Sequence, residues 1–445
     1  MTVCIQKNNT QERQYILSVL LDEFLGLTYT VEFSSKPEYK FVLGNKKELI
    51  FKDRFFSFHP ENGSYLKKEN LPNRVTLAKN DYTAEEDIPI LFGESGCWHT
   101  ENGIVCEIDI FAGSFFMLSR WEEYVCSEKD KHNRFPENKH VVIQNRIEQR
   151  PIVNEYVVML KNMLKALGCK QQFKSRNYSP VITHDIDFSQ RFNTPLHFFK
   201  ALVWSIIIKP GISAPFKIFK DYTAVLKGKP DPYNRYDFFM NISEKYRLKS
   251  LFYFIPAYKG EEGATYDIRD TEIVKAIKQI LRRGHSVGVH GSYGGYNCPE
   301  RFKSEQSRLA EIAGSVKEGR QHFLRFSVPK SIRLWENAGL KYDSSFGFSR
   351  HMGFRAGVCF PYSLFDIKER RKSQVQERPL IAMDAAMGRD KSSEKIIQNV
   401  KVLAKTVAKY KGDFVLLWHN NSFYDPHRRE LSLKYPELIE MLINK

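Results

Sequence analysis

The sequence lacks two hydrophobic features that would direct it to or through a membrane. It contains no run of about 18 or more apolar residues, which a membrane-spanning helix needs. Its first fifteen residues, MTVCIQKNNTQERQY, contain no apolar core of the kind found in a signal peptide. We therefore expect no transmembrane helix and a cytoplasmic location.

Paired cysteines are also missing. The seven cysteines are scattered, their number is odd, and no Cys-x-x-Cys pair occurs. A disulfide framework or a thiolate metal cage requires cysteines in matched or closely spaced pairs. The pattern is typical of reduced thiols in a cytosolic protein.

Acidic residues are too few to balance the basic ones. There are 52 Asp and Glu against 68 Lys and Arg, which gives a formal net charge of +16. An anionic membrane surface, an acidic glycan or nucleic acid would each favour such a charge. The chain has no zinc-finger spacing, RNP-like motif or long basic arm, so we do not expect nucleic acid as a partner. A basic surface that only aids solubility is equally open.

The length of 445 residues exceeds what one hydrophobic core usually organises and predicts two domains. Residues 1–175 are predicted to form a smaller α/β accessory domain. Its expected elements are helices over 15–27, 109–125 and 151–168, the second amphipathic with an acidic end, short strands over 40–44 and 48–52, and a polar loop over 126–141.

Residues 176–445 show strand-like runs that alternate with helical patterns. This alternation predicts a parallel α/β architecture, either a barrel or a doubly wound sheet. The predicted strands cover 180–187, 250–256, 286–292, 356–362, 379–384 and 414–420, and the clearest helices cover 271–284 and 393–412.

One inserted segment, residues 191–230, mixes Phe, Trp and Ile with Lys, and Asp221 is its one acidic residue. It is too short and too interrupted to span a bilayer. One interpretation is that it lies in a membrane interface, which would make the protein peripheral at the inner face of the membrane. The other interpretation is a helical hairpin that covers the barrel.

Polar side chains capable of chemistry follow three of the predicted strands. Asp185 and Asp187 alternate with Ile186 and therefore face the same side of an extended chain. His290 and His419 each stand at the carboxyl end of an apolar run. In parallel α/β folds, sites form beyond these strand ends. Two close carboxylates favour a cation, and added imidazoles suit zinc, iron, cobalt or nickel. Each motif alone also fits a helix cap or a structural histidine, but their combination indicates an enzyme.

The motifs around these residues resemble those of a known family, the NodB-homology polysaccharide deacetylases (carbohydrate esterase family 4). THDID (183–187), GHSVGVHGSY (284–293), AGLKYDSS (338–345) and LLWHN (416–420) are similar to the motifs of that family. The resemblance covers residues 176–445 and implies a distorted (β/α) barrel. Residues 1–175 resemble an uncharacterised domain that accompanies a bacterial branch of the family.

The resemblance implies an assignment of roles. Asp185 would be the base, Asp187 and His290 would bind a divalent metal, zinc by preference, and His419 would be the acid. The implied activity is hydrolysis of acetyl groups on a carbohydrate, at carbon–nitrogen or ester bonds. The substrate would be an acetylated glycan or a lipid-linked saccharide used in surface glycan or envelope polysaccharide metabolism.

Two alternatives remain beside this hypothesis. A catalytically degenerate barrel could bind glycan without hydrolysing it. A nucleotide-sugar glycosyltransferase could use Asp185 and Asp187 for a metal–diphosphate, but His290 and His419 would then have no role.

The sequence departs from the family pattern at one ligand. The second histidine of the motif would fall four residues after His290, where Gly294 stands. His322 lies where a third motif, similar to RQHF (320–323), has proline, and is therefore the candidate replacement. Catalytic zinc sites usually have three protein ligands. We expect the His322 side chain within about 6 Å of Asp187 and His290.

Five further residues are candidates for substrate binding. The arginines among them could instead orient Asp185 or form structural salt bridges. The five are Arg320, Arg325, Arg355, Tyr293 and Trp418.

Overall fold

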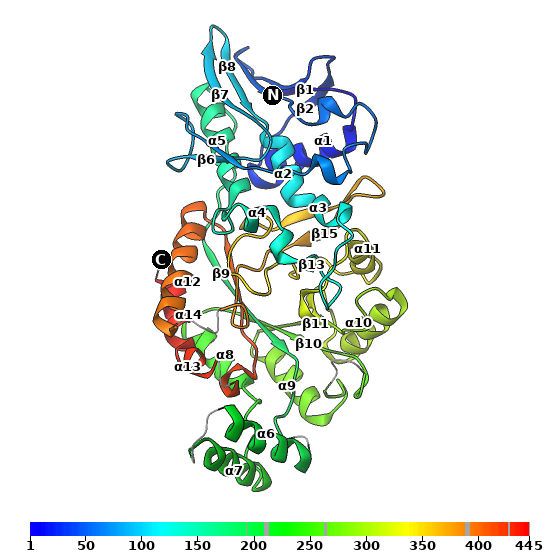
Figure 1. Cartoon of the computed structure of the whole chain (residues 1–445), viewed down its shortest axis with the longest axis vertical. Coiled ribbons are helices and arrows are strands. Elements are labelled where there is room, and N and C mark those ends of the chain that lie inside the picture. The colour runs from blue at the N-terminus through cyan, green and yellow to red at the C-terminus, as the bar shows by residue number, and fades with distance from the viewer. Residues whose placement is uncertain (193, 209–212, 262–264, 388–391, 426–427, 445) are drawn as a thin grey trace.

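The chain contains two large sheets that lie one after the other along its longest axis (Figure 1). A computed structural model describes residues 1–192, 194–208, 213–261, 265–387, 392–425 and 428–444. The strands of the first sheet lie within residues 2–108, and those of the second lie within 179–417. We propose that the predicted boundary near residue 175 separates two domains, although their buried apolar side chains join in one continuous cluster.

The N-terminal sheet has six strands in the order β2-β1-β3-β4-β8-β7. Its pairs are mixed, with β1–β2 and β4–β8 parallel and the others antiparallel. Its strands are β1 Thr2–Ile5, β2 Thr30–Phe33, β3 Glu38–Val42, β4 Glu48–Lys52, β7 Gly93–Thr100 and β8 Gly103–Ile108, and a separate hairpin joins β5 Thr76–Ala78 to β6 Ile88–Ile90.

Two of the predicted N-terminal helices need correction. The first begins earlier than expected, as α1 Thr10–Leu17, and continues as a π-helix over Ser18–Phe24. The predicted amphipathic helix is two helices, α2 Ile110–Ser119 and α3 Trp121–Val125. Every residue of α2 is buried because the helix is apolar on all sides. The helices α4 Val141–Gln144 and α5 Ile152–Ala166 follow the polar loop.

The second sheet has nine strands in the order β14-β15-β13-β12-β11-β10-β9-β17-β16. It is a curled and mostly parallel sheet, as in a distorted barrel that is not closed, and β14–β15 is its one antiparallel pair among the described residues. Its strands are β9 Ser179–Ile186, β10 Ser250–Phe254, β11 Ser286–Gly291, β12 Glu318–Gln321, β13 Tyr342–Asp343, β14 Tyr362–Asp366, β15 Arg371–Glu377, β16 Ala382–Met383 and β17 Asp413–Leu417. The strand predicted over 356–362 is wrong, since β14 begins where it ends.

Amphipathic helices cover this sheet. In α9 Thr271–Arg282 the buried residues are Ile273, Ala276, Ile277 and Ile280, which is the spacing of one helical face. Burial of each aliphatic side chain contributes about 1.5–3 kcal/mol. The other helices are α8 Tyr236–Lys245, α10 Pro299–Ala313, α11 Lys330–Asn337, α12 Ser393–Tyr410, α13 Arg429–Leu433 and α14 Tyr435–Ile443.

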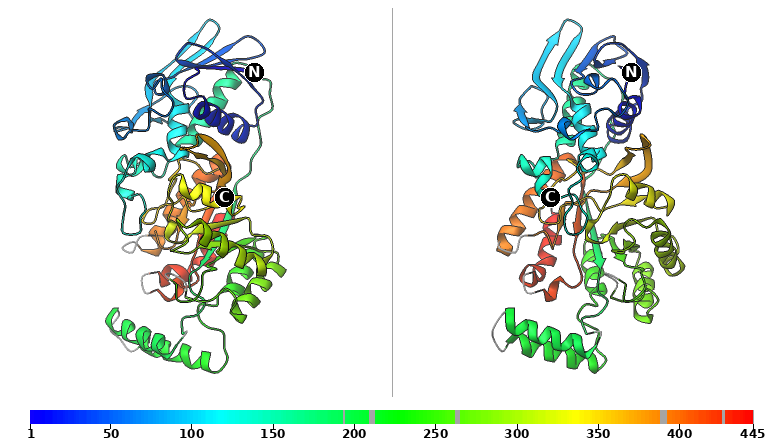
Figure 2. Two further views of the ribbon diagram at one scale, coloured as in Figure 1. Left: turned by 90° about the vertical axis from the view of Figure 1, so that its right-hand side faces the viewer. Right: turned by 45° about the vertical axis from the view of Figure 1, so that its right-hand side comes forward.

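The inserted segment is a helical hairpin of α6 Pro195–Ile208 and α7 Ser213–Leu226. It has a small apolar cluster of its own, which includes Phe198 and Ile218. The hairpin stands at the opposite end of the molecule from the N-terminal sheet (Figure 2). No helix among the described residues is long and apolar enough to cross a membrane.

Candidate functional site

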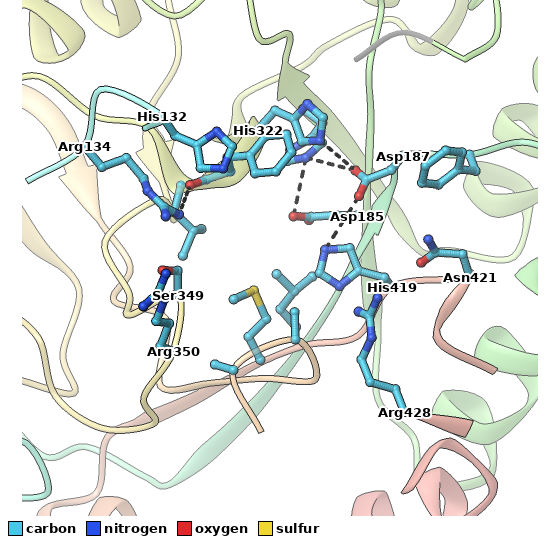
Figure 3. Close-up of a pocket in the computed structure, with 18 of the residues that line it drawn as sticks. His132, Arg134, Asp185, Asp187, His322, Ser349, Arg350, His419, Asn421 and Arg428 are labelled. Atoms are coloured by element: carbon cyan, nitrogen blue, oxygen red, sulfur yellow. Dashed lines mark hydrogen bonds and ion pairs between the residues drawn. The ribbon is translucent and has the colours of Figure 1, made fainter. Parts of the chain in front are cut away.

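The predicted site residues meet at one edge of the second sheet. Asp185 lies near the end of β9 and Asp187 directly follows that strand, while His290 lies near the end of β11. His322 follows β12, and His419 follows β17 by two residues. These strands are neighbours and run parallel, except that β10 lies between β9 and β11, so their carboxyl ends converge. Figure 3 shows the resulting group of side chains.

Asp187, His290 and His322 form a cluster of potential metal ligands. One ligand atom from each lies within 4.8 Å of the others. The Nε2 atom of His290 is 3.3 Å from Asp187 Oδ1, and that of His322 is 3.7 Å from the same oxygen. The expected proximity of His322 to the other two residues is confirmed.

The chemistry of the three donors fits a divalent cation. Bonds of about 2.0–2.1 Å in a tetrahedral zinc site hold ligand atoms a little over 3 Å apart, close to the distances found here. The Nδ1–H of His290 donates to the Arg320 carbonyl at 2.9 Å, so Nε2 is the ring atom that faces the carboxylate and would bind a metal. His322 Nδ1 is buried and has no hydrogen-bond partner among the described residues.

The charges in the cluster depend on one another. Burial raises the pKa of Asp187, but His322, His290 and His419 outweigh burial and lower it below the usual value. Burial lowers the pKa of His290, and Asp185 and Asp187 outweigh it and raise the value. Burial lowers the pKa of His322 to about 4, so this imidazole is neutral at pH 7 and can ligate a metal.

Arg320 holds Asp185 in place. Its Nη1 atom donates to Asp185 Oδ1 at 2.8 Å, and both side chains are almost completely buried. Nε of Arg320 donates to the Ser344 carbonyl at 2.7 Å, and Nη2 donates to Ser344 Oγ at 3.0 Å. Oδ2 of Asp185 faces His290 Nε2 at 3.6 Å. The DSS part of the 338–345 motif therefore supports the arginine that orients Asp185.

His419 has a partner that the sequence analysis missed. Its Nδ1 atom lies 2.6 Å from Asp384 Oδ1, and its Nε2 atom lies 3.8 Å from Asp187 Oδ2. Asp384 is fully buried and also accepts hydrogen bonds from the His419 backbone N–H and the Ser422 hydroxyl. The signal was present in the sequence, because Asp384 ends a predicted strand as Asp185 and His419 do.

The pair of His419 and Asp384 is strongly polarised. Burial lowers the pKa of His419, but the Asp384 carboxylate more than offsets burial and raises the value to about 9. Burial raises the pKa of Asp384, but His419 and Arg428 outweigh it and lower the value. At pH 7 His419 is therefore an imidazolium whose free Nε2–H points into the site.

Both aspartates and the three histidines of the site line a pocket of about 740 Å³, namely Asp185, Asp187, His290, His322 and His419. Opposite the carboxylates and histidines, its wall includes basic side chains from two other parts of the chain (Figure 3). Lys131, His132 and Arg134 come from the polar loop of the N-terminal unit, and Ser349 and Arg350 follow β13. The loop itself was predicted from the sequence, but its position in the wall of the pocket was not.

Four of the five predicted substrate contacts are corrected, of which three lie in the interior. Trp418 is fully buried and its ring packs against Tyr435, so it cannot reach the pocket. Arg320 is also fully buried and orients Asp185. Arg355 is buried in a salt bridge of 2.7 Å with Glu123, the structural alternative.

The other two predicted contacts lie near the pocket. Arg325 is buried and donates to the backbone carbonyls of His132 and Tyr293, so it braces the polar loop and does not face substrate. Tyr293 borders a cavity of about 340 Å³ that shares Asp187 and His322 with the pocket. Its role in substrate binding stays a prediction.

Comparison with family models gives a match over the N-terminal part of the chain. The model of a family of unknown function (DUF7033) matches residues 1–168. No curated protein matches the chain.

Three solved structures resemble the chain at a distance. They are a protein of Mycobacterium smegmatis assigned as a polysaccharide deacetylase (15% identity, 61% of this chain and 85% of that chain, TM-score 0.39), the 4-alpha-glucanotransferase of Thermococcus litoralis (13%, 60% and 37%, 0.37) and the chitin deacetylase of Colletotrichum lindemuthianum (10%, 60% and 84%, 0.29). Similarity this low carries no argument about chemistry, so the function below is inferred from the geometry of the site.

The replacement Asp384→Asn should lower the pKa of His419 from about 9, because it removes the negative charge that stabilises the imidazolium. Titration of the His419 ring by NMR in metal-free protein measures this. Ser422→Ala is the matched control, since it removes a neutral hydrogen bond to the same carboxylate and should change the pKa of His419 much less. A value for His419 that is the same in Asp384→Asn and wild type would contradict the pairing.

Proposed function

We propose that this protein is a metal-dependent hydrolase that removes acetyl groups from a carbohydrate. One observation supports this proposal above all others. Asp185 and His419 both adjoin the cluster of metal donors, and each is fixed by a buried partner of opposite charge. Acyl hydrolysis needs a base for the attacking water and an acid for the leaving group.

Asp187, His290 and His322 would hold the divalent cation. Zinc is the first choice for two imidazoles and one carboxylate, and iron, cobalt and nickel accept the same donors. When bound, such a cation polarises the acetyl carbonyl and lowers the pKa of water. The third donor, His322, takes the place that Gly294 cannot fill.

Asp185 would act as the general base. Arg320 occupies Oδ1 of this carboxylate, so Oδ2 is the atom that accepts the proton of the attacking water. The buried arginine fixes the direction of the carboxylate and keeps a positive charge beside it. Attack by the water forms the new carbon–oxygen bond, and the proton remains on Asp185 Oδ2.

His419 would act as the general acid. Its Nδ1 atom is bound to Asp384, so the proton that it can give away is on Nε2. A pKa of about 9 keeps this proton in place at neutral pH. An amine is a poor leaving group unless protonated, and transfer of the Nε2 proton to it lets the carbon–nitrogen bond break. The same transfer serves an alkoxide when the acetyl group is an ester.

Asp185→Asn should reduce acetate release by about 100-fold or more, because the amide oxygen is a very weak base. Zinc content should stay near that of wild type, since Asp185 is not one of the proposed ligands. Acetate is measured by a coupled enzyme assay on chitopentaose for amides and on acetylated xylan for esters, with zinc-loaded protein.

Asp237→Asn is the matched control, because this carboxylate lies on the exposed side of α8 and should leave the rate unchanged. Two results would contradict the proposal. One is an Asp185→Asn variant that keeps a tenth or more of the wild-type rate. The other is zinc-loaded wild-type protein that releases acetate from neither substrate.

A further inference from the structure

The basic wall of the pocket has no role in the proposed chemistry. We define the cationic wall as Lys131, Arg134 and Arg350, which all line the pocket. Arg134 and Arg350 lie across the pocket from Asp187 (Figure 3). Two of the three come from the N-terminal unit, whose family has no known function. The pocket is therefore built from both units of the chain.

The polar loop is fixed firmly to the rim of the second sheet. Arg134 Nη1 donates to the Phe323 carbonyl at 2.8 Å, and Arg325 Nε donates to the His132 carbonyl at 2.9 Å. The His132 ring stacks on Phe323 with 4.5 Å between centroids. Phe323 directly follows the metal donor His322, so the loop contacts the second sheet next to the proposed metal ligands.

A second anchor fixes Arg350. Glu137 accepts hydrogen bonds from the backbone N–H groups of Ser349 and Arg350, and its other contacts include the Ser349 hydroxyl and the His351 ring. These hydrogen bonds fix the polar loop and the backbone at Ser349 and Arg350 relative to each other. A preorganised wall loses little conformational entropy when it binds a ligand.

Two of the three charges of the wall are not neutralised by a carboxylate of the described residues. Arg134 forms a salt bridge of 2.7 Å with Asp130. Lys131 and Arg350 are exposed, and neither pairs with a carboxylate in the described part of the chain. Asp185 and Asp187 are the only carboxylates among the described residues that line the pocket, and Arg320 and the metal donors surround them. The far wall thus presents unmatched positive charge.

We propose that Lys131, on the loop anchored by Arg134, and Arg350, whose backbone is anchored by Glu137, form a subsite for an anionic group of the glycan, a carboxylate or a phosphate. Arginine binds such groups through paired N–H donors, and lysine adds a point charge. The subsite lies away from the acetyl group that the proposed function places at the metal donors, and it rests on that function for its carbohydrate ligand. The N-terminal unit then contributes to substrate selection.

The test compares glycans of equal length and different charge. Isothermal titration measures binding of a hyaluronan tetrasaccharide, which carries carboxylates, and of neutral chitotetraose to protein with Asp185→Asn, which prevents turnover. We expect the hyaluronan tetrasaccharide to bind about tenfold more tightly at low salt, with the preference reduced at high salt. Addition of Lys131→Ala and Arg350→Ala should abolish the preference and leave chitotetraose binding unchanged.

The matched control adds Lys401→Ala and Lys405→Ala, which remove two exposed charges from α12 and should preserve the preference. N-acetylglucosamine 6-phosphate distinguishes the source of the anion. If it binds more tightly than uncharged N-acetylglucosamine, and this difference is lost in the Lys131→Ala, Arg350→Ala protein, the subsite binds a phosphate. Equal binding of charged and neutral ligands, or a preference that survives both wall replacements, would overturn the subsite. If the protein releases acetate but binds charged and neutral glycans equally, the subsite is wrong and the proposed function stands. If it prefers charged glycans but releases no acetate, the proposed function is wrong and the subsite stands.

A separate observation concerns the helical hairpin. Of the sixteen large apolar side chains that are exposed among the described residues, seven lie between residues 196 and 226. They are Leu196, Phe199, Val203, Ile207, Phe216, Phe219 and Leu226. Their number in one short segment exceeds the scattered exposure that is normal for a protein surface.

The exposed side chains follow from the helical pattern of the hairpin. In α6 they recur at intervals of three and four residues and form a stripe. Phe198 and Leu202, on the other side of α6, belong to the cluster of the hairpin, where Phe198 stacks on Tyr222 of α7 at 4.2 Å. The side chains of the stripe therefore do not take part in packing the two helices together.

The charge around the stripe identifies the surface that it fits. Lys200, Lys220, Lys227 and Lys229 are exposed on the hairpin. Asp221, the one acidic residue between 191 and 230, lies 3.5 Å from Arg191 in an ion pair. A second copy of the hairpin would bring lysines against lysines, whereas anionic lipid headgroups would neutralise them.

The hairpin is connected directly to the site. Three residues separate Asp187 from Arg191, which stacks over the Tyr424 ring at 4.5 Å. Asn421, three residues before Tyr424, lines the pocket. We infer that the hairpin binds the surface of an anionic bilayer, apolar stripe toward the lipid and lysines toward the phosphates. This would bring the pocket near glycans attached to lipids.

Vesicle co-sedimentation tests this inference with phosphatidylcholine alone and with one quarter phosphatidylglycerol. Full-length protein should bind the mixed vesicles in a salt-sensitive manner and bind the neutral ones at least about tenfold less. The pair Phe199→Ser and Ile207→Ser should abolish binding, as should Lys220→Glu with Lys227→Glu. Val402→Ser with Leu433→Ser removes exposed apolar side chains elsewhere and should have no effect.

Equal binding of the hairpin variants and wild type to mixed vesicles would overturn the inference. So would wild-type protein that sediments as a dimer, fails to bind vesicles, and becomes monomeric in the Phe199→Ser, Ile207→Ser variant. The second result would assign the stripe to a contact between copies of the chain.

Discussion

The site depends on one electrostatic constraint, the presence of several electron-pair donors in one buried place. Asp187 directs its carboxylate at the Nε2 atoms of His290, His322 and His419, all within 3.8 Å. Lone pairs at such distances repel unless protons or a cation lie between them. His419 carries its own proton because of Asp384, but His322 has a low pKa and stays neutral. A divalent cation held by the carboxylate and by the imidazoles of His290 and His322 would resolve the remaining repulsion.

The rest of the second sheet provides what this arrangement needs. Parallel strands bring their carboxyl ends together, so residues far apart in sequence approach one another without strain. Each reactive group then has a buried partner that fixes its direction, Arg320 for Asp185 and Asp384 for His419. These partners make the site asymmetric, with an acceptor on one side and a proton donor on the other. A degenerate barrel that only bound glycan would have no need of either pair.

The sequence was sufficient to predict the position of residues that lie at the ends of apolar strands. Asp185, Asp187, His290 and His419 each follow an apolar run, and the parallel fold guarantees that such positions converge. Trp418 was predicted wrongly because adjacent residues at a strand end face opposite sides, so its neighbour His419 enters the site while Trp418 enters the core.

The cationic wall could not be predicted from the sequence. Lys131 lies in a polar loop without periodicity, about 190 residues before His322, which lines the same pocket. Only the docking of one unit on the other brings the two together. The strand expected over 356–362 was wrong for a different reason, because its apolar residues are buried in irregular backbone.

Zinc affinity tests the central claim most directly, measured by competition with a chromophoric chelator on wild type, His322→Ala and His351→Ala. His351 is an exposed histidine outside the proposed ligand set. The account predicts one zinc per chain in wild type, an affinity at least about tenfold lower in His322→Ala, and no change in His351→Ala. Equal zinc affinity in wild type and His322→Ala, or wild type that binds no zinc, would contradict it.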